Sequence, residues 1–167
     1  MQRSEVERLY DEHAEGIYRF LLALVRHRED ARDLVQDVFV RVARSEGVMD
    51  GVADHRAFLF RIARNAAFDR ARRIAVRRRA RASAETSPFA RSPDPDVRAF
   101  RDGVAAALAE LPDAQRSVVY LKLWENMTFE RIADICAIST NTAASRYRYG
   151  VEKLQALLHT LYMEITE

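Results

Sequence analysis

Apolar residues recur every three or four positions along most of the chain, which is typical of α-helices. Residues 4–25 carry the first apolar stripe, at Val6, Leu9, Tyr10, Ile17, Phe20, Leu21 and Leu24. Residues 29–44 carry the second, at Leu34, Val35, Val38, Phe39 and Val42. No alternating strand pattern bounded by turns occurs. The pattern therefore predicts two amphipathic helices with a short break at 26–28, followed by a glycine-containing loop at 45–54.

A third helix is predicted to begin at His55. At about 100° per residue, one side is apolar and is expected to face a core, with Phe58, Leu59, Ile62 and Ala66. The opposite side mixes arginines with an amide and an aromatic ring, at Arg61, Arg64, Asn65, Phe68 and Arg72. Guanidinium groups bind phosphates, and Asn and Phe can hydrogen-bond to and stack on bases. A solvated, arginine-rich face is the alternative at this point.

The chain changes character at residues 82–96, which are small and polar, include three prolines and lack apolar periodicity. This composition predicts a flexible linker. The periodicity resumes at about Val97, and Pro112 suits the first turn of a further helix. We therefore expect an all-α fold of two small helical domains, residues 1–81 and 97–167, joined by that linker.

Two closely spaced helices are predicted near the end of the second domain. Thr128 can cap a short helix, and Ser139 can cap a longer one that runs through Tyr149 and Leu154. Two helices joined by three or four residues match a helix-turn-helix, although many helical hairpins without a DNA-binding role share this spacing. The second helix opens with side chains suited to base edges and phosphates, at Thr140, Asn141, Ser145 and Arg148.

Positive charge is concentrated in one segment. The chain has a net charge of only +2, yet residues 55–81 contain ten arginines and one acid, Asp69. Both flanking parts of the chain are acidic. A near-neutral protein with one strongly basic segment is typical of a polyanion-binding protein.

Negative charge is concentrated on the second helix, at Asp30, Asp33 and Asp37. Acids in a first turn complement the helix dipole, which accounts for Asp30. Asp37 lies two turns further on and gains little from the dipole. Its position indicates a basic partner.

No enzyme site emerges from the sequence. The four histidines are scattered, and there is no glycine-rich phosphate loop or carboxylate cluster. The single cysteine, Cys136, excludes an internal disulfide and fits a reducing cytosol. No apolar run is long enough for a membrane span. We expect a cytoplasmic protein without catalytic activity, metal, cofactor or membrane insertion.

Three segments in order resemble one protein family. They are DARDLVQDVFVRV at 30–42, FLFRIARNAAFDRARR at 58–73, and the stretch from LAELPDAQ to YGVEKL at 108–154. Together they resemble the extracytoplasmic-function (ECF) sigma factors of bacterial RNA polymerase, in the sigma-70 family. The resemblance implies that 1–81 is sigma region 2 and that 97–167 is sigma region 4.

The resemblance also implies site residues. The polymerase-binding residues would be Asp33, Leu34, Gln36, Asp37 and Phe39. The minus-ten promoter element would be bound by Arg61, Arg64, Asn65, Phe68, Arg72, Arg73 and Arg77. The minus-thirty-five element would be bound by Thr140, Asn141, Ser145, Arg146, Arg148 and Tyr149. The implied partners are core RNA polymerase, promoter DNA and an anti-sigma factor.

Two alternatives stay open. An autonomous helix-turn-helix regulator would bind duplex DNA without polymerase, but the acidic second helix argues against it. A sigma mimic would act as a decoy that binds an anti-sigma factor and never contacts DNA. Such a decoy need not keep the arginine-rich face.

Overall fold

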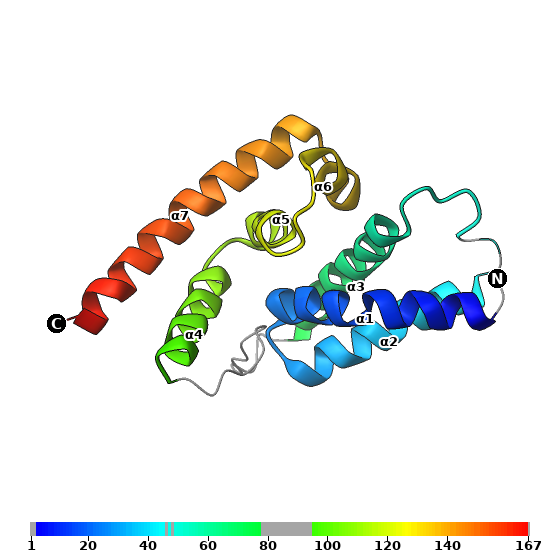
Figure 1. Ribbon diagram of the computed structural model, residues 1–167, viewed down its shortest axis with the longest axis horizontal. Helices are drawn as coiled ribbons and strands as arrows, with labels where there is room; N and C mark the ends of the chain where they lie inside the picture. Colours follow the sequence, from blue (N-terminus) through cyan, green and yellow to red (C-terminus); the bar gives the residue numbers. More distant parts are fainter. Residues whose placement is uncertain (1–2, 46, 48, 78–94, 167) are drawn as a thin grey trace.

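The computed structural model describes residues 3–45, 47, 49–77 and 95–166; in mid-chain its side-chain description stops at Ile74 and resumes at Arg101. Within these ranges there are helices and no strands, which confirms the predicted all-α class. The N-terminal half consists of α1 (Arg3–Val25), α2 (Arg28–Arg44) and α3 (His55–Arg77). The C-terminal half consists of α4 (Pro95–Ala109), α5 (Asp113–Leu123), α6 (Phe129–Cys136) and α7 (Thr140–Thr166) (Figure 1).

Helix boundaries follow the sequence pattern closely, with two differences. Helix α4 begins at Pro95, inside the predicted linker, because proline is well suited to a first helical position. The rest of that linker, 82–94, lies outside the described residues. Helix α7 continues to Thr166, beyond the Leu154 that ends the clear apolar pattern.

The core of the N-terminal half confirms the apolar stripe of α2, whose five predicted residues are all buried. The inward face of α3 is rotated from the predicted one. Leu59 is fully buried as expected, but Phe58, Ile62 and Ala66 are only half-buried. Their places are taken by Phe60, Ala63 and Ala67. The reason is that α3 packs on α1 and α2 on one side and on α6 on another.

The two halves are packed against each other. Helix α1 contacts α5, and α3 contacts α6, so that α5 and α6 lie between α7 and the N-terminal half (Figure 1). The Phe20 ring in α1 lies 5.3 Å from Phe60 and 5.6 Å from Tyr120 of α5, measured between ring centroids. One continuous hydrophobic cluster therefore includes residues of both halves.

The C-terminal half has a smaller core of its own between α4, α5 and α7. Its edge contains Arg116, which is only 6% exposed. The guanidinium group donates hydrogen bonds to the carbonyls of Leu108, Ala109 and Leu111 at 2.7–2.9 Å. The last carbonyls of a helix have no partners within it, so Arg116 satisfies the end of α4.

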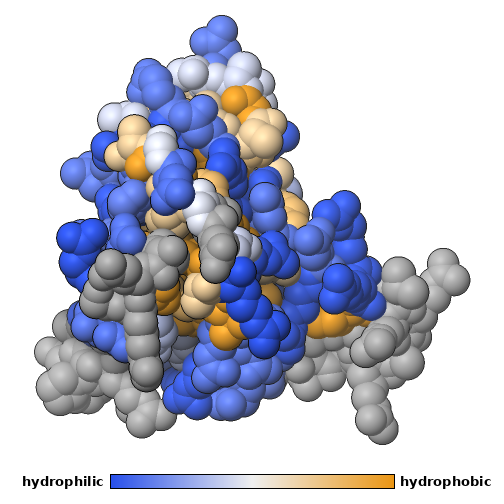
Figure 2. Space-filling view, turned by 90° about the vertical axis from the view of Figure 1, so that its right-hand side faces the viewer, coloured by the Kyte–Doolittle hydropathy of each residue, from blue (hydrophilic) through white to orange (hydrophobic). Residues whose placement is uncertain are grey.

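The face of the molecule in Figure 2 is mainly hydrophilic where the structure describes it. Figure 2 shows a face on which apolar side chains come to the surface only in small, separate areas. Among the described helices, none combines the length and the hydropathy that crossing a membrane would require.

Candidate functional site

Helix α2 presents an acidic edge to solvent. Asp33, Gln36 and Asp37 are exposed, as expected of residues that bind a partner. Leu34 and Phe39 are core residues instead, 3% and 6% exposed. The Phe39 ring packs edge-on against Tyr10, with 4.9 Å between the ring centroids. We therefore correct the prediction for Leu34 and Phe39: both hold α2 in place, and neither offers a substantial surface to a partner.

The first acid of the predicted ridge has an internal role. The Asp30 carboxylate accepts a hydrogen bond from Arg70 of α3 at 2.5 Å. Asp33 lies 3.9 Å from the same guanidinium group, at the edge of ion-pair distance. The acidic edge left for a partner thus consists of Asp33 and Asp37, with Gln36 between them; these three residues are called the α2 edge below.

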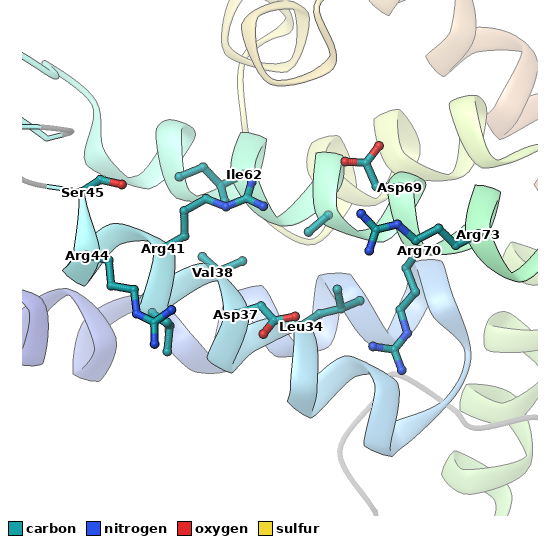
Figure 3. A pocket seen from close by; sticks show the side chains of 12 residues that line it. Leu34, Asp37, Val38, Arg41, Arg44, Ser45, Ile62, Asp69, Arg70 and Arg73 are labelled. Carbon is teal, nitrogen blue, oxygen red and sulfur yellow. The ribbon is translucent and has the colours of Figure 1, made fainter.

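A groove of about 410 Å³ separates α2 from α3 beside this edge. Its floor is apolar, with Leu34, Val38, Ile62 and Ala66, and its rim is charged, with Asp37, Arg41, Arg44, Asp69, Arg70 and Arg73. Figure 3 shows Asp37 between the arginines that follow it on α2 and those of α3. A partner helix laid along α2 would meet charges of both signs around a small apolar strip.

The exposed side of α3 carries four of the predicted nucleic-acid contacts: Arg61, Asn65, Arg72 and Arg73. The Arg61 guanidinium lies over the Phe58 ring, 4.9 Å from its centroid. Arg72 forms an ion pair with Asp69 at 2.5 Å, but its side chain remains 79% exposed. These four residues are called the α3 face below, and together they offer cationic groups and one amide to a nucleic acid.

Arg64 and Phe68 were predicted on the same face, but the structure places them beside it. Both are half-buried, and the Arg64 guanidinium stacks over the Phe68 ring at 4.2 Å. Its Nε atom is buried without a hydrogen-bond partner among the described residues. This correction has the same cause as the rotated core face, the packing of α3 on α6. The side chain of Arg77 lies outside the description.

The predicted helix-turn-helix is present in α6 and α7. Thr128 caps α6 by accepting a hydrogen bond from the Arg131 N–H at 3.3 Å. Ala137 ends α6 in the left-handed conformation, with φ 53°, and the next N–H, of Ile138, reaches back to Ala133 at 3.0 Å. This geometry ends α6 sharply, so that only residues 137–139 separate it from α7.

The second helix begins with the predicted cap. The Ser139 hydroxyl accepts a hydrogen bond from the Thr142 N–H at 3.1 Å, so that Thr140 and Asn141 lie exposed in the first turn of α7. Arg148 and Tyr149 are also exposed, and the Arg148 guanidinium lies 5.0 Å from the Tyr149 ring centroid.

Two more predicted residues of α7 are less accessible. Ser145 and Arg146 are half-buried. Ala143, on the packed side of the helix, is fully buried. Of the six predicted residues of α7, Thr140, Asn141, Arg148 and Tyr149 are therefore the accessible ones.

Cys136 lies in the packed interior, at the end of α6. The thiol is buried at the end of α6, and this burial raises its pKa. Arg64 and Arg146 are the nearby charges that oppose this shift of the pKa. No group of three or more His, Cys, Asp or Glu side chains in the described residues could hold a metal ion.

Two parts of the chain match known sigma-factor sequences. Residues 9–79 match the family Sigma-70 region 2, and residues 101–154 match the family Sigma-70, region 4. The chain is 31% identical over 156 residues to the ECF RNA polymerase sigma factor SigL of Mycobacterium tuberculosis, covering 92% of this chain and 88% of that protein. The chain belongs to the ECF sigma factors.

Other relatives agree with this assignment. The RNA polymerase sigma factor CarQ of Myxococcus xanthus is 33% identical over 165 residues, covering 95% of this chain and 92% of that protein. The fold matches the sigma factor RpoE of Bartonella quintana, solved in complex with the anti-sigma factor NepR. The TM-score is 0.79 at 22% identity, over 93% of this chain and 97% of that one. It also matches CnrH, solved with the cytosolic domain of CnrY, with a TM-score of 0.70 at 23% identity, over 95% of this chain and 90% of that one.

In this ECF sigma factor, the sequence patterns did not predict the ion pairs that join the two halves. Arg56 bonds to Glu125, and Asp54 bonds to Arg131. Arg56 is one of the ten arginines of residues 55–81. Residues of opposite charge are common throughout the chain, so no local signal could have identified these two pairs.

Proposed function

We propose that this sigma factor directs core RNA polymerase to specific promoters through three separate surfaces. They are the α2 edge, the α3 face and the exposed start of α7. The observation that supports this most strongly is the completed helix-turn-helix, because two side-chain caps and a left-handed turn present Thr140 and Asn141 at the tip of α7. We keep the predicted division into region 2 at 1–81, a linker at 82–96 and region 4 at 97–167.

The α2 edge would bind the polymerase. Asp33, Gln36 and Asp37 are exposed side by side on a helix whose other side is anchored in the core. Complementary charges guide association and exclude wrong partners. We therefore expect a basic helical surface of the polymerase to lie along this edge.

The α3 face would engage the minus-ten element. Arg61, Arg72 and Arg73 would neutralise phosphates, and Asn65, aided by loop 45–54, would capture a base that leaves the duplex. Unstacking a base costs a few kcal/mol, so the protein has to offer it hydrogen bonds and stacking. Phe68 is half-buried beneath the Arg64 guanidinium, so it could stack on that base only after this contact is released.

The start of α7 would bind the minus-thirty-five element. In a helix-turn-helix the second helix enters the major groove, and its first residues contact base edges. Thr140 and Asn141 occupy that position, and Arg148 follows two turns later. Arginine pairs with the O6 and N7 atoms of guanine, which makes Arg148 the strongest candidate for sequence discrimination.

The proposal includes an anti-sigma factor as a further partner, which is supported by the fold shared with RpoE in its complex with NepR. We also propose that the chain itself catalyses no reaction, needs no metal or cofactor and acts in the cytoplasm.

A gel shift with and without core polymerase tests this function. DNA recovered from a randomised promoter library should be bound specifically only when polymerase is present. Tight, specific binding of duplex DNA by the chain alone would favour the autonomous regulator. Failure to bind polymerase or DNA, with retained binding of an anti-sigma factor, would favour the decoy.

A further inference from the structure

One glycine lies inside the helix that is proposed to bind the minus-thirty-five element. Gly150 is buried and stands ten residues beyond Thr140, the first residue of α7. Glycine is the poorest helix former after proline, so a glycine inside a helix lowers stability unless its missing side chain is needed. Its φ is not positive, so the backbone conformation does not require glycine. The need for glycine therefore comes from the residues around it.

Helix α5 leaves no room for a side chain at this position. A Cβ atom on Gly150 would lie 2.6 Å from the Cγ2 atom of Val119 and 3.5 Å from the Cβ atom of Gln115. Carbon atoms of different residues pack at about 3.5–4.0 Å, so the first of these contacts cannot form without movement. Val119 is fully buried, and a valine in a helix has one strongly preferred rotamer, so its methyl group has nowhere to turn. A side chain on Gly150 would therefore push α7 away from α5 by about 1 Å.

Such a movement would reach the start of α7. The helix runs from α6 past α5 and α4 and packs on all three (Figure 1). Near its start, Ala143 is fully buried in the cluster that includes Ile132 of α6. Ala143 and Gly150 are about two turns apart and so lie on the same side of the helix. Two small residues thus let α7 lie close to both of its supports.

The two supports together determine the direction of the helix. With Ala143 held by α6, a displacement at Gly150 would tilt α7 and turn Thr140 and Asn141 away from their original direction. Thr140 lies about 15 Å from Gly150 along the helix, at about 1.5 Å per residue. Groups that recognise a ligand have to be held within about 0.5 Å of their productive geometry. A movement of about 1 Å would therefore misalign contacts to base edges.

We propose that Gly150 is a positioning residue for promoter recognition. Its missing side chain lets α7 lie directly on Val119 of α5, and this close contact sets the direction in which Thr140, Asn141 and Arg148 meet the minus-thirty-five element. The inference rests on the proposed function of α7. It adds a residue that does not itself contact DNA.

Gly150→Ala tests the proposal in selection from a randomised promoter library, with core polymerase and the full chain. Discrimination at the minus-thirty-five element should fall about tenfold, within the range expected when a bidentate base contact is lost, and the minus-ten preference should stay unchanged. The double variant Gly150→Ala/Val119→Ala should restore most of the discrimination, because it removes the Cγ2 atom. A merely structural role would weaken the binding of all promoter sequences equally.

Gly16→Ala is the matched control. Gly16 also lies inside a helix, α1, but a Cβ atom there would meet Glu125 and Phe60 at 3.6–3.8 Å, which is ordinary contact. This variant should keep the wild-type preference at both elements. In urea denaturation it should be more stable than the wild type, because alanine is the better helix former, whereas Gly150→Ala should be less stable.

Each other outcome is decisive. An unaltered minus-thirty-five preference with Gly150→Ala would overturn the positioning role and leave the sigma function standing. A loss that Val119→Ala did not restore would overturn the contact as its cause. If Gly150→Ala alone did not fold, the double variant would decide: a wild-type preference would support the proposal, and an altered one would overturn it. If the wild-type chain gave polymerase no minus-thirty-five preference, the proposed function of α7 would fail, and the positioning role with it.

Discussion

Arg56 donates hydrogen bonds to both the side chain and the backbone of Glu125, a residue 69 positions away in the other half of the chain. This arginine belongs to the basic segment that indicates nucleic-acid binding, yet it is used inside the protein. Arg70 is similar, because its guanidinium group holds Asp30 of α2. The ten arginines of residues 55–81 thus include both structural residues and residues exposed to solvent. Only the exposed ones can contact DNA.

Asp37→Arg should abolish polymerase binding and leave the fold intact. Asp37 is exposed and has no hydrogen bond or ion pair with the residues that the structure describes, whereas a charge reversal against a basic partner costs several kcal/mol. Co-purification with core polymerase measures the effect. Glu29→Arg is the control, since Glu29 is an exposed acid of the same helix outside the α2 edge. Wild-type recovery of polymerase with the Asp37 variant would contradict the assignment.

Asn65→Ala should impair strand opening more than formation of the closed promoter complex, because an amide that captures an extruded base acts only after opening starts. Arg73→Ala should weaken binding to all DNA sequences. It should also reduce the slope of the logarithm of the binding constant against the logarithm of the salt concentration by about one, as the loss of a phosphate contact does. Permanganate footprinting reports opening, and filter binding at several salt concentrations reports the phosphate contacts. Unchanged opening with Asn65→Ala would count against base capture.

Arg148→Ala should relax the preference at one position of the minus-thirty-five element and leave the minus-ten preference unchanged. A bidentate contact to guanine is worth about 1–3 kcal/mol of discrimination. Selection from a randomised promoter library measures the preference. Lys153→Ala is the control, because Lys153 lies further along α7 and bonds to the Glu110 carbonyl. Uniformly weaker binding with an unaltered preference would mean that Arg148 contacts only phosphate.

Ala137→Gly should stabilise the protein by about 1 kcal/mol. Ala137 adopts a left-handed conformation with φ 53°, which disfavours any residue with a Cβ atom. The same substitution at Ala156, an exposed residue inside α7, should destabilise it by about 1 kcal/mol, because glycine is a poor helix former. Urea denaturation compares the two variants. If both substitutions lowered the free energy of unfolding, the left-handed conformation of Ala137 would not be strained.

The sequence predicted the local elements well because local physics determines them. The apolar period specified α1 and α2, and the hydroxyls of Thr128 and Ser139 specified the starts of α6 and α7. Both caps are confirmed. The protein family could also be predicted from the sequence, because three segments typical of the family occur in the same order along the chain.

The orientation of α3 and the contact between the halves could not be predicted. Apolar residues with a period of 3.6 indicate that one side of a helix is buried. They do not indicate how many other helices pack against it. Phe60 is buried against Phe20, and Arg64 is half-buried beside α6, because α3 is covered on two sides. That second neighbour, α6, is distant from α3 in the sequence, and nothing in the sequence of α3 itself indicates the contact.

Run-off transcription with purified core polymerase tests the central claim most directly. The template would be a promoter selected by the polymerase together with this chain. We predict a transcript of defined length that depends on the chain, that is lost with Asp37→Arg and that is strongly reduced with Asn65→Ala. Transcription that is indifferent to both substitutions, or no transcript although the chain binds polymerase, would contradict the account.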